Sequence, residues 1–225
     1  MVFSGITGWI LPLAALSALI YLLAFCWLGA SVLKSAVKTL AVGLLAVAAI
    51  YAQAPLWLIA ALALGSVGDF FLSREGDRAF LFGLVAFAAA HLAYVVLFLS
   101  HPVFDARLLI DPSRAVAAVV LGLFAAGMAR LLWPRTGALR LPVMAYLVII
   151  CAMGLAALGL PLTQPAGIAL IGAALFILSD AVLSLELFVL PATHAARRVT
   201  PFVIWSTYWL AQAVFLMAFA LIGPA

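Results

Sequence analysis

Long apolar runs, separated by short clusters of glycine, proline and charged residues, dominate the pattern along the chain. A transmembrane helix needs about 20 apolar residues to cross the hydrocarbon core of a bilayer. The runs are long enough for this, and the clusters between them leave no room for a water-soluble domain. The pattern predicts helices near residues 8–28, 33–51, 55–73, 79–100, 114–133, 141–160, 166–189 and 201–222.

Helices are favoured over a transmembrane β-barrel, the other fold that satisfies backbone hydrogen bonds in lipid. Barrel strands alternate apolar and polar residues, whereas residues 40–50 and 141–160 are long apolar runs. We therefore expect an all-α, polytopic membrane protein. Its fold is one transmembrane domain over residues 1–225, in which about eight helices enclose a polar cavity.

The composition supports a chain that has lipid as its solvent. Hydrophobic residues make up 69% of it and charged residues 8%, against about 25% charged residues in a typical soluble domain. The net charge of +4 comes from residues scattered over short loops, so it indicates neither nucleic acid nor an obligate protein partner. Cys26 and Cys151 lie in apolar runs and are interpreted as small buried residues.

The basic residues predict how the chain crosses the membrane. If the loops alternate between two sides, one side receives Arg107 and Arg114. The positive-inside rule places the more basic side in the cytoplasm, with both termini on the opposite side of the inner (plasma) membrane. The residues on the more basic side are Lys34, Lys38, Arg74, Arg78, Arg130, Arg135, Arg140, Arg197 and Arg198.

Two aspartates within the predicted spans are candidates for chemistry, because an ionised group in the bilayer costs a few kcal/mol or more. Asp69 follows the small residues of segment 65–68, which allow a neighbouring helix or ligand to come close. Its structural alternative is an ion pair at the helix end with Arg74 or Arg78. Asp180 lies about nine residues, or ~14 Å, from the end of its span, beyond easy reach of the interface.

Lys38 lies one turn deeper than Lys34 and therefore needs a partner. An ion pair between Lys38 and Asp180 is the structural alternative to a chemical role for that aspartate. Glu186 lies closer to the end of its span and is interpreted as a structural residue at the interface.

His91 lies in the middle of the fourth span, on one stripe with Tyr94, which is the expected hydrogen-bond partner if the histidine is only structural. In the last span, Tyr208 and Gln212 share a face with two tryptophans. The tryptophans fit an aromatic belt at the interface, whereas Gln212 is too deep for that and is expected to face the interior. These polar groups come from different helices at similar depths, which favours one shared cavity.

The missing motifs narrow the chemistry. The chain contains no Gly-x-Ser-x-Gly elbow, no His-Glu-x-x-His zinc motif and no phosphate-binding P-loop. His91 is the only histidine inside a predicted span, so no three-histidine metal site can form there, and no metal or other cofactor is predicted. Two carboxylates with one histidine leave a metal site open as an alternative.

Two aspartates in unlike surroundings are typical of acid-catalysed cleavage of an acetal-like bond. A carboxyl group in an apolar site can keep its proton near neutral pH, and a second one beside a cation such as Lys38 stays ionised. An amphipathic lipid would supply the bond.

Four short motifs resemble, in order and spacing, the YhhN family of membrane proteins, whose mammalian members are lysoplasmalogenases. The likeness covers nearly the whole chain, although Lys38 is followed here by Thr39 where family members often carry proline. The motifs are Gly68-Asp69-Phe70-Phe71-Leu72, Phe80-x-x-Gly83-x-x-x-Phe87-x-x-x-His91-x-x-Tyr94, Ser179-Asp180-x-x-Leu183 and Tyr208-x-x-Ala211-Gln212.

The resemblance implies an enzyme that hydrolyses the vinyl ether bond of a lysoplasmalogen, giving a fatty aldehyde and glycerophospho-ethanolamine or -choline. For this reaction we expect the deeper Asp180 to donate the proton and Asp69 to stabilise the cation or activate water. His91 and Tyr94 would then hold the water or the headgroup, and Lys38 would pair with a carboxylate or the substrate phosphate. Tyr208 and Gln212 would line the pocket.

Two other functions stay open from the sequence. One is a different lysolipid hydrolase, with or without a metal. The other is a proton-coupled transporter of lipids or small molecules, because membrane Asp and His residues also serve proton relays. Against transport, the spans lack the Gly/Pro breaks in mid-helix that often mark transport sites.

Overall fold

The computed structural model describes residues 7–221, and within that range the chain is helical with no strand. The eight predicted helices are confirmed, with ends that differ from the expected ones by a few residues. Residue 222 of the last predicted span and both chain termini lie outside the described residues. The helices are α1 Thr7–Ile20, α2 Val32–Tyr51, α3 Leu56–Leu72, α4 Asp77–Leu99, α5 Pro112–Leu132, α6 Arg140–Leu158, α7 Ala169–Phe188 and α8 Thr200–Leu216.

Short helical turns extend several of these helices. A π-helical turn, Tyr21–Phe25, continues α1, and another, Met217–Leu221, continues α8. With these extensions, seven helices within residues 7–221 are long and apolar enough to cross a membrane. The eighth, α3, has 17 residues and rises ~25 Å, at the short end of the range for a spanning helix. The chain is therefore built as a multi-pass membrane protein.

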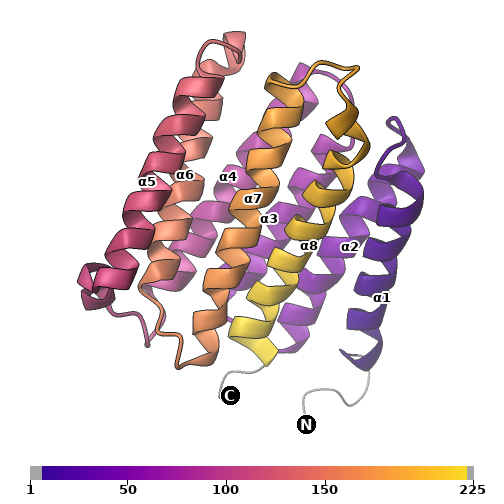
Figure 1. The fold of residues 1–225 in the computed structure, drawn as a ribbon. Helices are drawn as coiled ribbons and strands as arrows, with labels where there is room; N and C mark the ends of the chain where they lie inside the picture. The colour runs from indigo at the N-terminus through magenta and orange to yellow at the C-terminus, as the bar shows by residue number, and fades with distance from the viewer. Residues whose placement is uncertain (1–6, 222–225) are drawn as a thin grey trace.

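The helices run alternately up and down, and the two described ends of the chain lie at the same end of the bundle (Figure 1). In Figure 1, α7 and α8 pass in front of α2, α3 and α4, with α5 and α6 on one side and α1 on the other. A contact between two loops at the same end of the bundle is consistent with this up-and-down order. The Trp27 side chain donates to the Arg198 carbonyl (2.9 Å), which joins the α1–α2 and α7–α8 loops at the more basic end.

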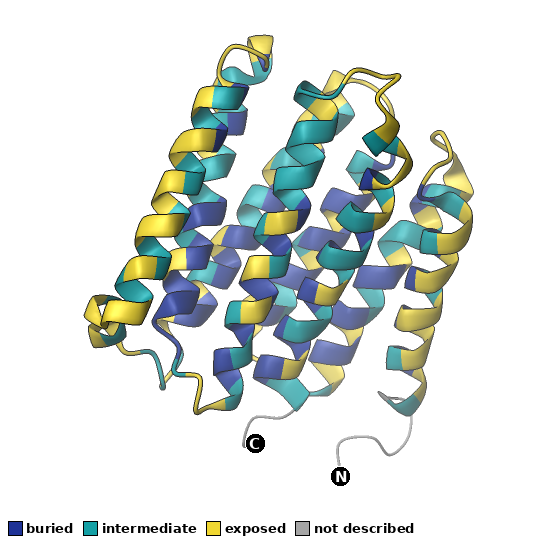
Figure 2. Ribbon diagram, in the orientation of Figure 1, coloured by how far each residue is buried: buried dark blue, intermediate teal, exposed yellow. Residues whose placement is uncertain are grey.

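The outward faces of the bundle are apolar, as a lipid environment requires. Figure 2 shows exposed positions along the outer sides of α1 and α5 and buried positions facing inward. On α5, Val116, Val119 and Leu123 are each more than 60% exposed. A soluble protein rarely exposes a continuous apolar surface of this kind, so these faces are the lipid-contacting ones.

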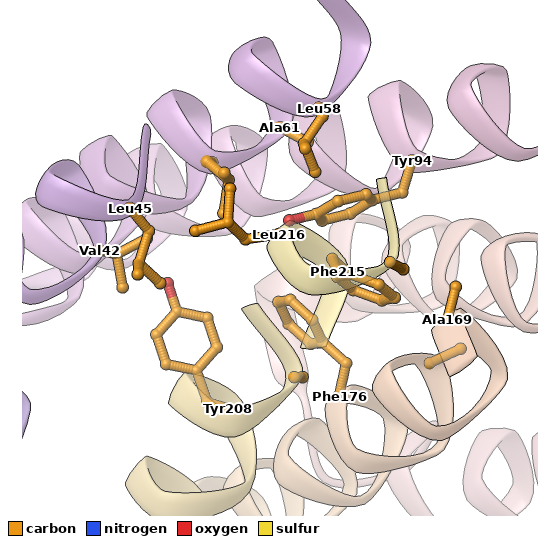
Figure 3. Packing of buried hydrophobic residues seen from close by; sticks show 14 of the residues in the cluster. Val42, Leu45, Leu58, Ala61, Tyr94, Ala169, Phe176, Tyr208, Phe215 and Leu216 are labelled. Atoms are coloured by element: carbon orange, nitrogen blue, oxygen red, sulfur yellow. The ribbon is translucent and has the colours of Figure 1, made fainter. Parts of the chain in front are cut away.

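Aromatic side chains from α4, α7 and α8 fill the centre of the bundle (Figure 3). The Phe215 ring lies 4.3 Å from the Tyr94 ring and 5.6 Å from the Phe98 ring, measured between centroids. A Cβ added at Gly172 would lie 2.7 Å from Phe215, so α7 reaches α8 this closely only because position 172 has no side chain. Small residues at helix contacts are a common device for packing helices in membranes.

Gly172→Ala is predicted to destabilise the bundle, because Phe215 is fully buried among other rings and cannot move aside. Overpacking of this kind costs about 1–3 kcal/mol. The measurement is the apparent melting temperature in detergent, which should fall. Gly122→Ala in α5 is the matched control, because nothing lies within 4 Å of its added Cβ. An equal fall in both variants would contradict the close α7–α8 contact.

Candidate active site

A cavity of about 520 Å³ opens at the more basic end of the bundle and extends between the helices. This volume falls in the usual range for small-molecule sites. Four of the seven candidate catalytic and substrate-binding residues line it: Lys38, Asp69, Asp180 and Tyr208. They come from α2, α3, α7 and α8, so helices far apart in sequence build one space.

Asp69 is fully buried and forms an ion pair with Lys38, whose Nζ lies 3.2 Å from its Oδ1. The Tyr208 hydroxyl donates to the other oxygen, Oδ2, at 2.7 Å. The Lys38 ammonium also lies 5.9 Å from the Tyr21 ring and 5.8 Å from the Trp205 ring, where cation–π attraction supports it. Both carboxylate oxygens thus face donors, which is the arrangement that stabilises the anion.

These contacts correct two structural alternatives. Asp69 does not pair with Arg74 or Arg78, and Lys38 does not pair with Asp180. The inward orientation of Asp69 explains the difference, because its side chain points into the bundle while the arginines follow the helix end. Among residues 7–221, the Lys38–Asp69 pair is the one ion pair between side chains.

A chain of hydrogen bonds runs from the core to Asp69. Tyr94 donates to the Gln212 side-chain oxygen, and Gln212 Nε2 donates to the Tyr208 hydroxyl at 3.3 Å, which in turn donates to Asp69. Tyr94 and Gln212 are completely buried and are not among the residues that line the cavity. Gln212 faces the interior, as expected, and lies behind the lining residues of the cavity. The hydrogen bonds of Tyr94 and Gln212 hold the Tyr208 hydroxyl, the partner of Asp69, in place.

Two glycines of segment 65–68 allow this arrangement. A Cβ at Gly65 would lie 2.7 Å from Gln212 Nε2, and one at Gly68 would lie 2.6 Å from the Phe87 ring. Between them, the Ser66 hydroxyl donates to the Thr39 carbonyl of α2 at 2.9 Å. The small residues let α2, α4 and α8 approach α3 around Asp69, as the segment suggested.

Asp180 has a different environment. It is half-buried, lines the cavity and accepts a hydrogen bond from the Tyr146 hydroxyl of α6. The structure places no cation in ion-pair contact with it among residues 7–221. Sequence reasoning missed Tyr146, which lies inside the apolar run 141–160. Tyr146 carries the one side-chain hydroxyl in this apolar run, and that hydroxyl was the signal that could have identified it as a site residue.

His91 is completely buried, and its Nδ1 lies 2.6 Å from the Phe87 carbonyl. The prediction that Tyr94 is the hydrogen-bond partner of His91 is wrong, because the Tyr94 hydroxyl donates to Gln212 instead. A carbonyl can only accept, so Nδ1 carries the proton and Nε2 is left as an acceptor. The imidazole packs edge-to-face on Tyr146 at 5.4 Å and on Phe176 at 4.4 Å, and it does not line the cavity.

The mouth of the cavity is polar. Arg74, Asp77 and Glu186 line it at the basic end. Glu186 accepts a hydrogen bond from Thr200 in α8, which fits the structural role expected for it. Arg74 also lies 4.8 Å from the Phe70 ring.

The tryptophans of α8 do not form an interfacial belt, which corrects that interpretation. Trp205 is 3% exposed, and its indole N–H donates to the Ala18 carbonyl at 3.0 Å. Trp209 donates to the Ala41 carbonyl at 3.1 Å. Each indole thus joins α8 to another helix, because an indole N–H in lipid needs an acceptor.

Asp69, His91 and Asp180 do not form a metal-binding group. Within residues 7–221, no three His, Cys, Asp or Glu side chains are close enough together to hold an ion. The inner part of the described cavity offers the carboxyl groups of Asp69 and Asp180, their hydroxyl partners and the Lys38 ammonium, and its mouth adds Arg74, Asp77 and Glu186.

Comparison with known proteins finds a protein family whose pattern matches most of the chain. The YhhN family matches residues 33–219. Two proteins named lysoplasmalogenase, from Mycobacterium bovis (strain ATCC BAA-935 / AF2122/97) and Mycobacterium tuberculosis (strain CDC 1551 / Oshkosh), are each 31% identical over 201 residues. The aligned part covers 85% of this chain and 72% of each relative. No solved structure matches the chain.

Lys38→Met is predicted to destabilise the protein strongly, because it leaves the Asp69 charge buried without its cation. Breaking a buried pair in this way costs about 3–5 kcal/mol. The double variant Lys38→Met/Asp69→Asn should regain most of the loss, since no unpaired charge remains. The check is the apparent melting temperature of the single and double variants in detergent. Additive losses would show that the pair is not coupled.

Proposed function

The chain belongs to the YhhN family, and we propose that this member hydrolyses the vinyl ether bond of lysoplasmalogens inside the membrane. The products are a fatty aldehyde and glycerophospho-ethanolamine or -choline. The observation that carries the proposal is the pair of carboxyl groups, Asp69 and Asp180, that line one cavity with unlike partners. The lysoplasmalogenase names of the two relatives support it.

Asp180 is the proposed proton donor. Its partner is a neutral phenol, so a proton on this carboxyl group leaves no charge uncompensated in the apolar cavity. The proton goes to the β-carbon of the vinyl ether, the double bond supplies the electron pair, and an oxocarbenium ion forms at the carbon bonded to oxygen. General acid catalysis of this kind contributes typically about 10²–10⁴-fold.

Asp69 is the proposed stabiliser of that cation. Lys38 and Tyr208 hold it as an anion, so its charge is present before the reaction starts. Water then adds to the oxocarbenium carbon and gives up a proton to a carboxylate. The resulting hemiacetal loses its hydroxyl proton, the bond from its carbon to the ether oxygen breaks, and that oxygen takes up a proton. Aldehyde and glycerol hydroxyl result, with no net change in protons.

Three of the other candidate residues position the hydrogen-bond partners of Asp69 and Asp180. We assign Tyr94 and Gln212 to orienting Tyr208, and His91 to packing against the Tyr146 ring that holds Asp180. His91 thus acts as a positioning residue here and does not contact the substrate. At the mouth, Arg74 is placed to attract the substrate phosphate, the role that Lys38 cannot fill while it pairs with Asp69.

We also propose that the cavity opens to the cytoplasmic side of the inner (plasma) membrane. The loops at its mouth carry most of the lysine and arginine residues, and such loops stay in the cytoplasm. A lysolipid in the cytoplasmic leaflet then presents its headgroup to the mouth.

Asp180→Asn is predicted to lower turnover at least about 100-fold, since an amide cannot donate the proton. Asp69→Asn should also lose most activity, through loss of the fixed negative charge. Aldehyde release from lysoplasmenyl-ethanolamine by purified, folded protein in detergent is the measurement. Asp111→Asn, an exposed aspartate at the opposite end, is the control and should keep full activity. Full turnover in both site variants would refute the assignment.

The orientation is tested by cysteines that leave every lysine and arginine in place. In a Cys26→Ala/Cys151→Ala background, Glu75→Cys marks the basic end and Ala106→Cys the other end, both at exposed positions. In intact cells, a membrane-impermeant maleimide should label position 106 and not position 75. Labelling of position 75 without permeabilisation would reverse the proposed orientation.

A further inference from the structure

Beside the main cavity lies a second, narrow hollow of about 30 Å³ between α5, α6 and α7 (Figure 1 shows these helices). It is referred to below as the α5–α7 groove. Its lining is almost entirely apolar and includes Phe124 and Met128 of α5, Ile150 of α6 and Ile177 of α7. Nothing in the hydrolysis described above uses this space.

The groove and the main cavity adjoin each other and share part of one wall. Val143, Tyr146, Asp180 and Ser184 line both of them. The carboxyl group proposed as proton donor and its tyrosine partner therefore stand at the boundary between a polar-mouthed cavity and an apolar groove. In a lysoplasmalogen, the vinyl ether bond likewise lies between a polar part, the glycerophosphate, and an apolar part, the hydrocarbon chain.

The direction of the groove matches that of a lipid chain. Leu132 and Val143 lie near the basic end of their helices, whereas Phe124 and Ile150 lie seven or eight residues deeper. At 1.5 Å per residue the groove therefore runs ~10–12 Å toward the middle of the membrane. Hydrocarbon chains in a bilayer also point from the interface to the midplane.

Helix α5 is the element best able to yield to a chain. It buries only Met128 and Leu132, and a Cβ added at Gly122 or Gly127 would meet nothing within 4 Å. Met128 is unbranched and flexible, which suits a wall that adapts to its contents. The α5 wall of the groove is therefore the wall with the fewest buried residues.

We propose that the α5–α7 groove binds the hydrocarbon chain of the lysolipid and thereby sets the chain-length preference of the enzyme. The headgroup then occupies the main cavity toward Arg74, and the vinyl ether lies against Asp180 where the two spaces meet. This inference rests on the proposed lysoplasmalogenase activity, although the occupancy of the groove can be tested without hydrolysis.

The first test fills the groove. Ala181→Phe places a ring in it from α7, and Ala174→Phe adds the same ring on the exposed face of the same helix as the matched control. The readout is kcat/KM for lysoplasmenyl-ethanolamine with an octadecenyl chain relative to an octenyl chain. Ala181→Phe should lower this ratio about tenfold, the effect of excluding about two methylene groups from apolar contact. An unchanged ratio in Ala181→Phe would overturn the proposal.

The second test uses binding alone, so it does not require Ala181→Phe to fold or the enzyme to turn over. Lysophosphatidylethanolamine with a diazirine at the end of its chain is photolysed with the wild-type protein, and labelled peptides are identified by mass spectrometry. Labels on the groove-lining residues Phe124, Met128, Ile150 and Ile177 support the groove. Labels confined to Phe80 and Phe188 of the main cavity refute it.

The two proposals can fail separately. Groove labelling with no aldehyde release from any lysoplasmalogen leaves the groove standing and rejects the hydrolase function. Aldehyde release with labels only in the main cavity, and with an unchanged chain-length ratio, rejects the groove and keeps the hydrolase.

Discussion

The ion pair between Lys38 and Asp69 constrains the interior of this bundle more than any other contact. Each charge alone is costly in a lipid-embedded interior, so the two must stay together wherever the helices move. The pair joins α2 to α3, and Tyr208 joins α8 to the same carboxylate. The position of three helices around the cavity thus follows from one buried charge and its donors.

The same pair also separates the two carboxyl groups in their chemistry. Asp69 has a cation and a phenol as partners, whereas Asp180 has only the Tyr146 phenol. One site therefore offers a fixed negative charge and a group that can carry a proton. Acid-catalysed cleavage through a cationic intermediate needs both, which is why the proposed function rests on this contrast and not on either aspartate alone.

Close packing of the helices around Asp69 maintains the difference between its surroundings and those of Asp180. Gly65 and Gly68 bring α8 and α4 against α3, so that Gln212 and Phe87 enclose the buried side of Asp69. The apolar outer faces of α1 and α5 need no such fit, because lipid adapts to them. The core is accordingly packed most closely around Asp69 and least closely at α5, next to the proposed chain-binding groove.

The sequence by itself determined the eight helices, their alternation and the basic end, because apolar run length and loop charge are local properties. It also selected Lys38, Asp69, Asp180 and Tyr208, since polar groups are costly in lipid wherever they point. Only the tertiary structure decided the partners: Lys38 with Asp69, Tyr146 with Asp180, and Gln212 and His91 behind the cavity. Those choices depend on how each helix is rotated, which side-chain packing between distant segments fixes and local pattern does not.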